Sequence, residues 1–485
     1  MEEPKRGELK GRVARGVAWS LAEKVLSAAL QVAVSLTILS LLTREDLGIM
    51  ALLTAVSAVA IVLADSGFSQ TLIRKSDPTE GDFKAVFVFN VSVATALYGV
   101  FVALAPWAAE YYAMPELREL APVFFLILPV NALCTVQNTL LVRSFRFALI
   151  SKIQFAASLL SGAVAIGLAL MGWGVWSLVW QRVVLFVLRS VLLWSFGSWS
   201  PRGRGDYGAL RGMASYSCSL MATDLITTFY TKIPQFFLGR LYTADTLGAF
   251  DQAVKLKDQP VTSAVQAVQS VTFPALSKIA EDRPRFSESY RQIVLTVAFV
   301  LFPMMFGLSA VAEDLFAALL GEEWMPTVPY LQVVAMAGLF YPISMIAFNV
   351  LKVKSGGGLL IRIEILKKVL MTAVFALTIP HSVEAVVWGL VVISFLEMAV
   401  NMWAAQRFVD VGVGRWVRTL LPIVAVTLLM YGAVESVDKL LNISPLVSLF
   451  VEIGVGVAVY TALSWAFRLE AFGEVKNILL KYLRK

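Results

Sequence analysis

The chain has 485 residues, of which 58% are hydrophobic and 15% charged, and its mean hydropathy is +0.75. Soluble globular domains carry about 25% charged residues, so this composition argues against a soluble fold. The formal net charge of +7 does not indicate nucleic acid binding, because the basic residues lie in short loops between apolar runs. Two cysteines and one histidine provide neither a disulfide framework nor a histidine-rich metal centre.

Fourteen segments are long and apolar enough to cross a membrane, which takes about 20 mostly apolar residues. The first is too long for the core of a cleavable signal peptide, so we expect it to be a retained helix. The seventh and eighth are the most polar. The sequence therefore predicts an all-α integral membrane protein. The predicted spans are residues 16–42, 47–73, 83–106, 119–142, 148–171, 175–197, 208–238, 247–273, 290–311, 328–351, 359–379, 385–408, 416–434 and 446–467.

The loops between these segments alternate in charge. Every even-numbered loop is basic, whereas the odd-numbered loops together hold only Arg44, Arg118, Arg240 and Lys439. One odd-numbered loop, residues 313–323, is acidic. A missed span would invert the alternation from that point onward. We therefore expect an even number of spans, with both termini in the cytoplasm.

The chain also repeats itself at a shift of 200 residues. Residues 41–48 read LLTREDLG, and residues 241–248 read LYTADTLG. A few matches could arise by chance, but their equivalent place in each half argues against that. Two parallel repeats of six helices are typical of transporters that bind substrate between their halves and alternate access. The expected domains are an N-terminal lobe, residues 1–200, a C-terminal lobe, residues 201–412, and two extra helices with a basic tail, residues 413–485.

Six basic residues lie inside the predicted spans, where a charge costs on the order of 3 kcal/mol and normally faces a cavity or a partner. Lys24 and Lys255 stand on polar stripes of spans in opposite halves, which predicts a cationic cleft that binds an anionic group such as phosphate. Two alternatives stay open. Lys24 could snorkel to the surface, and Lys255 could pair with Asp251 one turn away. The candidate substrate-binding residues are Lys24, Lys255, Arg182, Arg189, Lys232 and Lys257.

Acidic residues inside the spans are candidates for binding a coupling cation or proton, or for neutralising a buried basic residue. Asp224 lies near threonines, and Glu397 shares a helix face with Asn401, so both offer oxygen clusters that suit a small cation. Glu23 and Asp65 are expected to pair near the inner surface. The ion-coupling candidates are Asp224, Glu397, Asp251, Asp258 and Glu364.

Several functions lack their signatures in this sequence. No Walker A motif occurs, so no ATP-driven mechanism is indicated. The loops are too short for a soluble domain or for a carboxylate-based site of glycosyl transfer. We therefore expect a transporter and not an enzyme, with no catalytic residues, no metal site and no cofactor beyond Na⁺ or H⁺ as coupling ion. An integral membrane glycan polymerase or ligase is the enzyme alternative.

A series of short motifs runs in order through residues 12–410. They are GVAWS at 16–20, TREDLG at 43–48, DSGF at 65–68 with LIR at 72–74, AP at 105–106, YY at 111–112, PEL at 115–117, GWGVWSLV at 172–179, WSP at 199–201, LGAF at 247–250, VTFPAL at 271–276 and GEEW at 321–324. In order and spacing, this series resembles the polysaccharide-transport branch of the multidrug/oligosaccharidyl-lipid/polysaccharide exporter superfamily, close to the colanic-acid, teichuronic-acid and O-antigen flippases.

The resemblance implies two six-helix lobes around a cationic cavity. It implies that an undecaprenyl-pyrophosphate-linked oligosaccharide moves from the inner to the outer leaflet of a bacterial or archaeal cytoplasmic membrane, coupled to an ion gradient. The family's basic cavity residues fall on Lys24 and Lys255, where relatives often carry arginine; lysine cannot form arginine's bidentate contacts. The implied partners are the lipid-linked glycan, membrane lipids and glycan polymerase or assembly proteins, without nucleic acid.

Two other functions within the same superfamily stay open. A peptidoglycan-precursor (lipid II) flippase shares the expected fold and charge, so the sequence distinguishes it poorly from a flippase of lipid-linked oligosaccharides. A multidrug or cation antiporter would need an acidic cavity, and the basic stripes argue against one.

Overall fold

The computed structural model describes residue 34 and residues 37–475, apart from 198, 204, 356, 441 and 442. Side chains at 264, 266–271, 273–275, 357 and 413 also fall outside the description. Every regular element in the described part of the chain is a helix, which confirms the predicted all-α class. Most of the first predicted span, residues 16–42, lies outside the described residues, together with Lys24 and Glu23.

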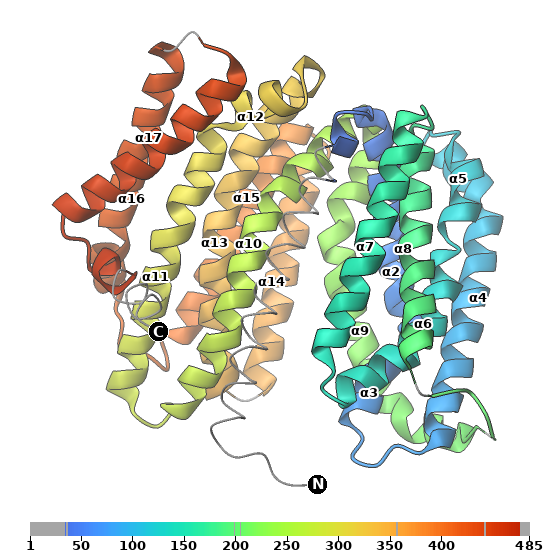
Figure 1. Cartoon of the computed structure of the whole chain (residues 1–485). Helices are drawn as coiled ribbons and strands as arrows, with labels where there is room; N and C mark the ends of the chain where they lie inside the picture. The colour runs from blue at the N-terminus through green and yellow to red at the C-terminus, as the bar shows by residue number, and fades with distance from the viewer. Residues whose placement is uncertain are drawn as a thin grey trace, which may run out of the picture. The chain divides into compact units, whose positions relative to one another are not determined.

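The helices group into two compact units, Met1–Gly248 and Ala249–Lys485. In the first unit, α4 packs against α6, and α6 packs against α8 (Figure 1). The sequence places residues 208–238 in the second lobe, whereas α9 packs against α2, α3 and α4 in the first unit. The helices of this unit are α2 (Arg44–Asp65), α3 (Phe68–Arg74), α4 (Glu80–Tyr111), α5 (Leu117–Phe124), α6 (Ile127–Arg143), α7 (Phe147–Leu170), α8 (Val175–Phe196) and α9 (Tyr207–Leu241), and α10 (Ala244–Lys278) continues from it into the second unit.

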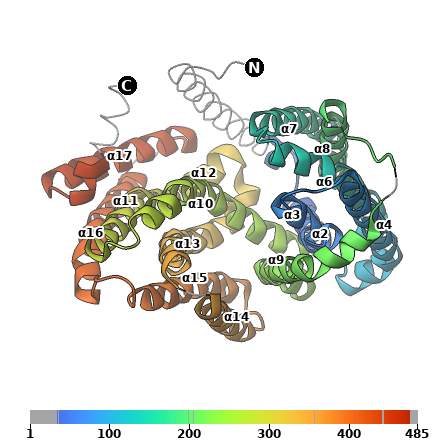
Figure 2. The ribbon, with the colours of Figure 1, turned by 90° about the horizontal axis from the view of Figure 1, so that it is seen from below.

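The second unit is organised around α13, which packs against both α11 and α15, while α14 packs against α15 (Figure 2). Its large apolar core draws on α11, α13, α16 and α17. The elements after α10 are α11 (Arg283–Ala310), α12 (Ala312–Leu319), the 3-10 helix η1 (Glu322–Thr327), α13 (Val328–Lys354), α14 (Gly357–Thr378), α15 (Val383–Ala405), α16 (Val413–Leu440) and α17 (Pro445–Ala466).

Ten segments of the described chain are helical, long and apolar enough to cross a membrane, so the protein is a multi-pass membrane protein. The long helices α9, α10 and α14 are more polar and fall outside these ten. Two of them, α9 and α10, correspond to the seventh and eighth predicted spans, which are also the most polar in the sequence. The count of fourteen spans stays a prediction.

Two predicted spans are broken in the structure. The segment 47–73 was expected to be one helix, but it divides into α2 and α3 at Ser66 and Gly67, whose φ angles are +50° and +73°. The segment 119–142 likewise divides into α5 and α6. Apolar periodicity continues across both breaks, so it does not reveal them. The left-handed backbone at Ser66 and Gly67 ends α2 and starts α3 in a new direction.

Side chains at helix ends fix the start of α2. Thr43 and Asp46 form a capping box, in which each side chain binds the other residue's backbone N–H. The second carboxylate oxygen of Asp46 accepts a hydrogen bond from the backbone N–H of Val175 at 3.0 Å. One aspartate therefore caps α2 and also anchors the start of α8.

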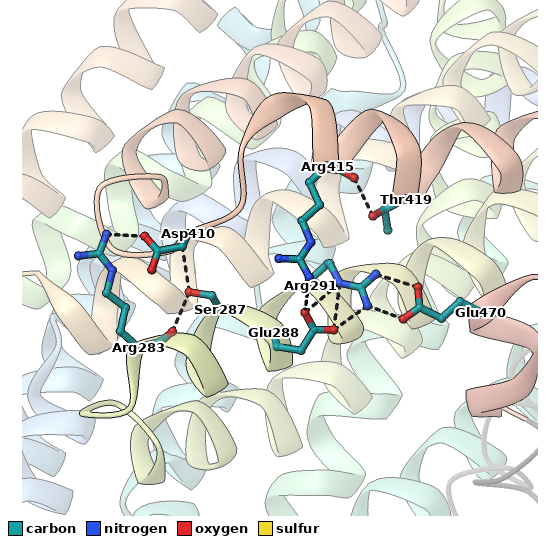
Figure 3. Close-up of polar contacts among 8 residues, drawn as sticks. All are labelled: Arg283, Ser287, Glu288, Arg291, Asp410, Arg415, Thr419 and Glu470. Carbon is teal, nitrogen blue, oxygen red and sulfur yellow. Dashed lines mark hydrogen bonds and ion pairs between the residues drawn. The ribbon is translucent and has the colours of Figure 1, made fainter.

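A charged network joins α11 to the C-terminal part of the second unit (Figure 3). The side chain of Arg291 is 8% exposed and donates hydrogen bonds to the carboxylates of both Glu288 and Glu470. Arg415, at the start of α16, donates to Glu288 at 2.9 Å. Because a buried guanidinium is costly without partners, this network holds α16 and the segment after α17 against α11.

Candidate functional site

The break between α2 and α3 lies against α9. A Cβ atom on Gly67 would lie 2.4 Å from the carbonyl oxygen of Ser217, so only glycine allows this approach in addition to the positive φ. The hydroxyl groups of Thr71 and Ser217, both buried, form a hydrogen bond of 2.7 Å. Arg143 of α6 donates to the carbonyl oxygens of Leu72 and two neighbouring residues at the end of α3. The short helix α3 is thus held in place by both α6 and α9.

A cavity of about 290 Å³ opens at this break, between α2, α3, α6, α8 and α9. Three of these helices, α2, α6 and α8, lie in segments apolar enough to cross a membrane. The volume holds several waters, since a water molecule takes about 30 Å³ in the liquid. A cavity large enough for several waters, with charged and polar lining, therefore lies beside three helices that can cross a membrane.

The charged groups of the cavity come from three different helices. Asp65 ends α2, Arg189 lies on α8 and Asp224 lies on α9, and all three are half-buried. The Ser69 hydroxyl donates to Asp65, and the Gln70 amide donates to Asp224 at 3.2 Å. With both carboxylates ionised, these three groups carry one net negative charge. One monovalent cation or one proton would neutralise it.

The remaining polar lining comes from α6. Asn131, Thr135 and Asn138 follow one another at helical spacing and present amide and hydroxyl groups to the cavity. The side-chain oxygen of Asn138 is buried and has no hydrogen-bond donor within the described structure. Amide, hydroxyl and carboxylate oxygens are ligands suited to small hard cations. These α6 residues are not among the candidates predicted from the sequence, although their i, i+4, i+7 spacing in an apolar span was a usable signal.

Only some of the candidate residues predicted in the first half line the cavity. The structure brings Arg189 and Asp224 together in the cavity, and adds Asp65, which was expected to pair with Glu23. Arg182 and Lys232 are half-buried, and neither is among the described residues that line the cavity.

The second-half candidates form local ion pairs. Lys255 binds Asp251 at 2.6 Å, as in the alternative considered for it, and its own side chain remains 49% exposed. Lys257 pairs with its neighbour Asp258 at 2.5 Å. Both ion pairs join residues of one helix, α10.

The acids of α14 and α15 lie near lysines. Glu364 pairs with the buried Lys367 at 2.5 Å. Glu397 lines a narrow pocket together with Lys367. Asn401 donates to the hydroxyl of Ser344 at 2.8 Å, so its amide nitrogen is occupied within the helix packing. The oxygen cluster expected around Glu397 is therefore also a site of positive charge.

The sequence is similar to that of a family of polysaccharide biosynthesis proteins. The sequence profile of the family described as "Polysaccharide biosynthesis protein" matches residues 38–329. The chain is 26% identical over 399 residues to the succinoglycan biosynthesis transport protein ExoT of Rhizobium meliloti, covering 81% of this chain and 80% of ExoT. It is 24% identical over 372 residues to the teichuronic acid biosynthesis protein TuaB of Bacillus subtilis, covering 75% of this chain and 76% of TuaB.

Two solved structures share the fold. The lipid II flippase MurJ in an inward closed conformation superposes with a TM-score of 0.72 at 13% identity, covering 93% of this chain and 98% of MurJ. An inward-facing multidrug resistance transporter of the MATE family, within the MOP superfamily, gives a TM-score of 0.58 at 16% identity, covering 79% of this chain and 94% of that chain. At these identities the likeness shows a common fold and leaves the transported molecule open.

Proposed function

The chain belongs to the polysaccharide biosynthesis protein family, and from this premise we propose that it flips a lipid-linked glycan across the membrane. It is a multi-pass transporter, which removes the glycan polymerase or ligase considered from the sequence. Relatives named for succinoglycan transport, teichuronic acid biosynthesis and lipopolysaccharide biosynthesis support a glycan as the cargo.

The proposed reaction carries an undecaprenyl-pyrophosphate-linked oligosaccharide from the inner to the outer leaflet of the cytoplasmic membrane by alternating access, with both termini cytoplasmic. The observation that carries this proposal is a charged cavity, large enough for several waters, beside helices of a family member that can cross a membrane. Charged groups at this depth cost free energy in lipid, so they are retained where a transport cycle uses them.

The anionic head group needs basic contacts, and these are proposed at Lys24, Lys255, Arg182, Arg189, Lys232 and Lys257. Two of them, Lys255 and Arg189, differ in whether they form an ion pair. Lys255 is half exposed, so its ammonium group can exchange Asp251 for a phosphate oxygen. Arg189 makes no ion pair with any described residue, and it lines the cavity of the first unit. Arginine there can bind two oxygens of a phosphate at once.

The coupling ion, Na⁺ or H⁺, is proposed to bind at Asp224 together with Asp65. Their cavity carries one net negative charge and is lined by neutral oxygens, which favours a monovalent cation. Glu397 and Glu364 share Lys367, while Asp251 and Asp258 each have a lysine partner. Each of these four acids pairs with a lysine or shares its pocket with one, whereas Asp224 forms no ion pair with a described residue, so they are weaker candidates than Asp224.

A deletion strain tests the function directly. Cells without the gene should accumulate one lipid-linked oligosaccharide in the inner leaflet. The wild-type gene should clear it, and so should the variant Arg118→Ala, which changes an exposed residue in the first turn of α5. Arg189→Ala should fail to clear it while reaching the membrane in normal amounts. Accumulation of the peptidoglycan precursor instead would support a lipid II flippase. Unchanged lipid pools with increased drug sensitivity would support a multidrug antiporter.

A further inference from the structure

Three carboxylates from three helices converge in the second unit. They belong to Asp314 in the first turn of α12, Asp438 in the last turn of α16 and Glu452 on α17. One carboxylate oxygen from each lies within 4.8 Å of those of the other two. We propose that this acid triad, Asp314, Asp438 and Glu452, binds a hard divalent cation of the Ca²⁺ type, which ties α12 and α16 to α17.

The burial of Glu452 is a separate observation that points to a ligand. Its side chain is almost fully enclosed, at 1% exposure. One of its oxygens accepts a hydrogen bond from Ser448 at 3.1 Å, but no donor among the described residues reaches the other oxygen, Oε2. Oδ2 of Asp314 is also buried without a donor. Buried carboxylate oxygens are costly unless a donor or a cation satisfies them, and a bound cation would satisfy both.

Among the described residues, no basic side chain forms an ion pair with Asp314, Asp438 or Glu452. The lysine beside the triad, Lys439, forms its ion pair with Glu435 at 3.8 Å. Asp438 also stands at the C-terminal end of α16, where the helix dipole disfavours negative charge. Local helix electrostatics therefore do not account for an acid at Asp438, whereas coordination of a shared cation does.

The spacing and chemistry of the triad fit Ca²⁺. This ion takes six to eight oxygen ligands at about 2.3–2.6 Å, so two ligands on opposite sides of it lie about 4.6–5.2 Å apart. Three carboxylates offer up to six oxygens, and water can complete the shell. Mg²⁺ demands a tighter octahedron and usually keeps several of its own waters, so it fits an all-carboxylate triad less well.

The triad has apolar side chains on one side and is exposed to solvent on the other. An apolar cluster of Val311, Val434 and Leu449 lies beside it, and each of these residues precedes one of the three acids by about one helical turn. The cluster closes one side to water. Asp438 is exposed and leaves the other side open, so an ion can enter.

This proposal does not depend on the transported molecule, so the purified full-length protein in detergent can test it. Thermal unfolding is followed with CaCl₂ or with EGTA at equal ionic strength, and Ca²⁺ affinity is measured by isothermal titration calorimetry. We expect the Tm to rise with the logarithm of Ca²⁺ concentration above the Kd, because the ion binds only the folded state. Asp438→Asn should weaken Ca²⁺ affinity at least tenfold, and Glu452→Gln should abolish the shift in Tm.

The matched control is Glu313→Gln, which removes an exposed acid from the same turn of α12. It should respond to Ca²⁺ like the wild type. A wild-type protein with the same Tm in CaCl₂ and in EGTA would overturn the proposal and leave a shared proton as the link between Glu452 and Asp314. A normal Ca²⁺ response in Asp438→Asn would overturn it as well. Asp438 is exposed, so this variant decides the matter even if Glu452→Gln does not fold.

Discussion

Gly48 and Gly248, one in each copy of the repeated sequence, meet in a contact that leaves no room for a side chain. A Cβ atom on Gly48 would lie 1.8 Å from the carbonyl oxygen of Ala244, and one on Gly248 would lie 1.8 Å from the carbonyl oxygen of Arg44. The contact is reciprocal, as expected for equivalent segments related by a two-fold axis. An ion pair between Arg44 and Asp245 at 3.0 Å accompanies it. The repeated turns therefore bind each other.

Gly48→Ala and Gly248→Ala should each destabilise the protein. Overpacking typically costs about 1–3 kcal/mol, and a clash with backbone at this distance belongs at the upper end or beyond, because no flexible side chain can move aside. Thermal unfolding in detergent should show a clearly lower Tm for both. Gly99→Ala is the control, since its Cβ would meet nothing within 4 Å. An unchanged Tm in Gly48→Ala would mean that the turns do not meet as described.

Arg291 should matter more than other arginines of the second unit. Its buried guanidinium binds Glu288 and Glu470 together, so Arg291→Ala should cost about 1.5–3 kcal/mol, the range for hydrogen bonds to charged groups (Figure 3). Arg291→Lys should recover part of the loss, because lysine keeps the charge without the bidentate fork. The measurement is Tm together with protease sensitivity after α17.

The control for Arg291 is another arginine at the start of α11. Arg283 pairs with Asp410 at 2.8 Å, but both side chains are more than half exposed. An exposed pair contributes about 0–1 kcal/mol, so Arg283→Ala should barely change the Tm. Equal losses in the two variants would contradict the role given to the buried network.

The membrane-embedded helices were readily predictable, whereas the site was not. Lipid requires every spanning backbone to be hydrogen-bonded internally, so long apolar runs leave few alternatives to a helix. The break at Ser66 and Gly67 was missed, since it depends on a local left-handed turn and on the approach of α9 at Ser217, which apolar periodicity does not report. Asp65 reaches the cavity because of that break.

For the charged residues too, the sequence indicates the candidates but not which of them come together. Arg189 and Asp224 could be named as candidates from their place inside spans, but their meeting in one cavity depends on how α8 and α9 pack around α6 and α2. Lys255 looked like a free cavity lysine or a partner of Asp251, and one helical turn of spacing could not decide between them. The structure shows the pair.

Lys255 can therefore be tested against its partner. Lys255→Ala removes an ion pair from Asp251, whose side chain is 7% exposed, so it should lower both Tm and glycan export. The double variant Lys255→Ala with Asp251→Asn removes the unbalanced charge and should restore the Tm. If Lys255 binds the head group, export should stay low in the double variant, as measured by lipid-linked glycan in the outer leaflet. Restored export would reduce Lys255 to a structural partner.

The last prediction concerns the carboxylates of the first-unit cavity. Asp65 and Asp224 line one cavity together with Arg189, so neutralising either acid should remove the net negative charge that attracts a cation. Asp224→Asn and Asp65→Asn should each lower gradient-driven export about 5–150-fold, the range for a coupling free energy of about 1–3 kcal/mol. Their Tm should not fall, since one of two like charges is removed.

Proteoliposomes with an imposed Na⁺ or H⁺ gradient measure this effect and identify the ion. The control is Glu110→Gln, an exposed acid on α4 of the same unit, which should transport normally. Loss of export with and without a gradient would assign the two aspartates to cargo binding and not to coupling. Normal gradient-driven export in both Asn variants would exclude the cavity as the coupling site. Glu397→Gln would then be the next variant to measure, because Glu397 also lines a pocket.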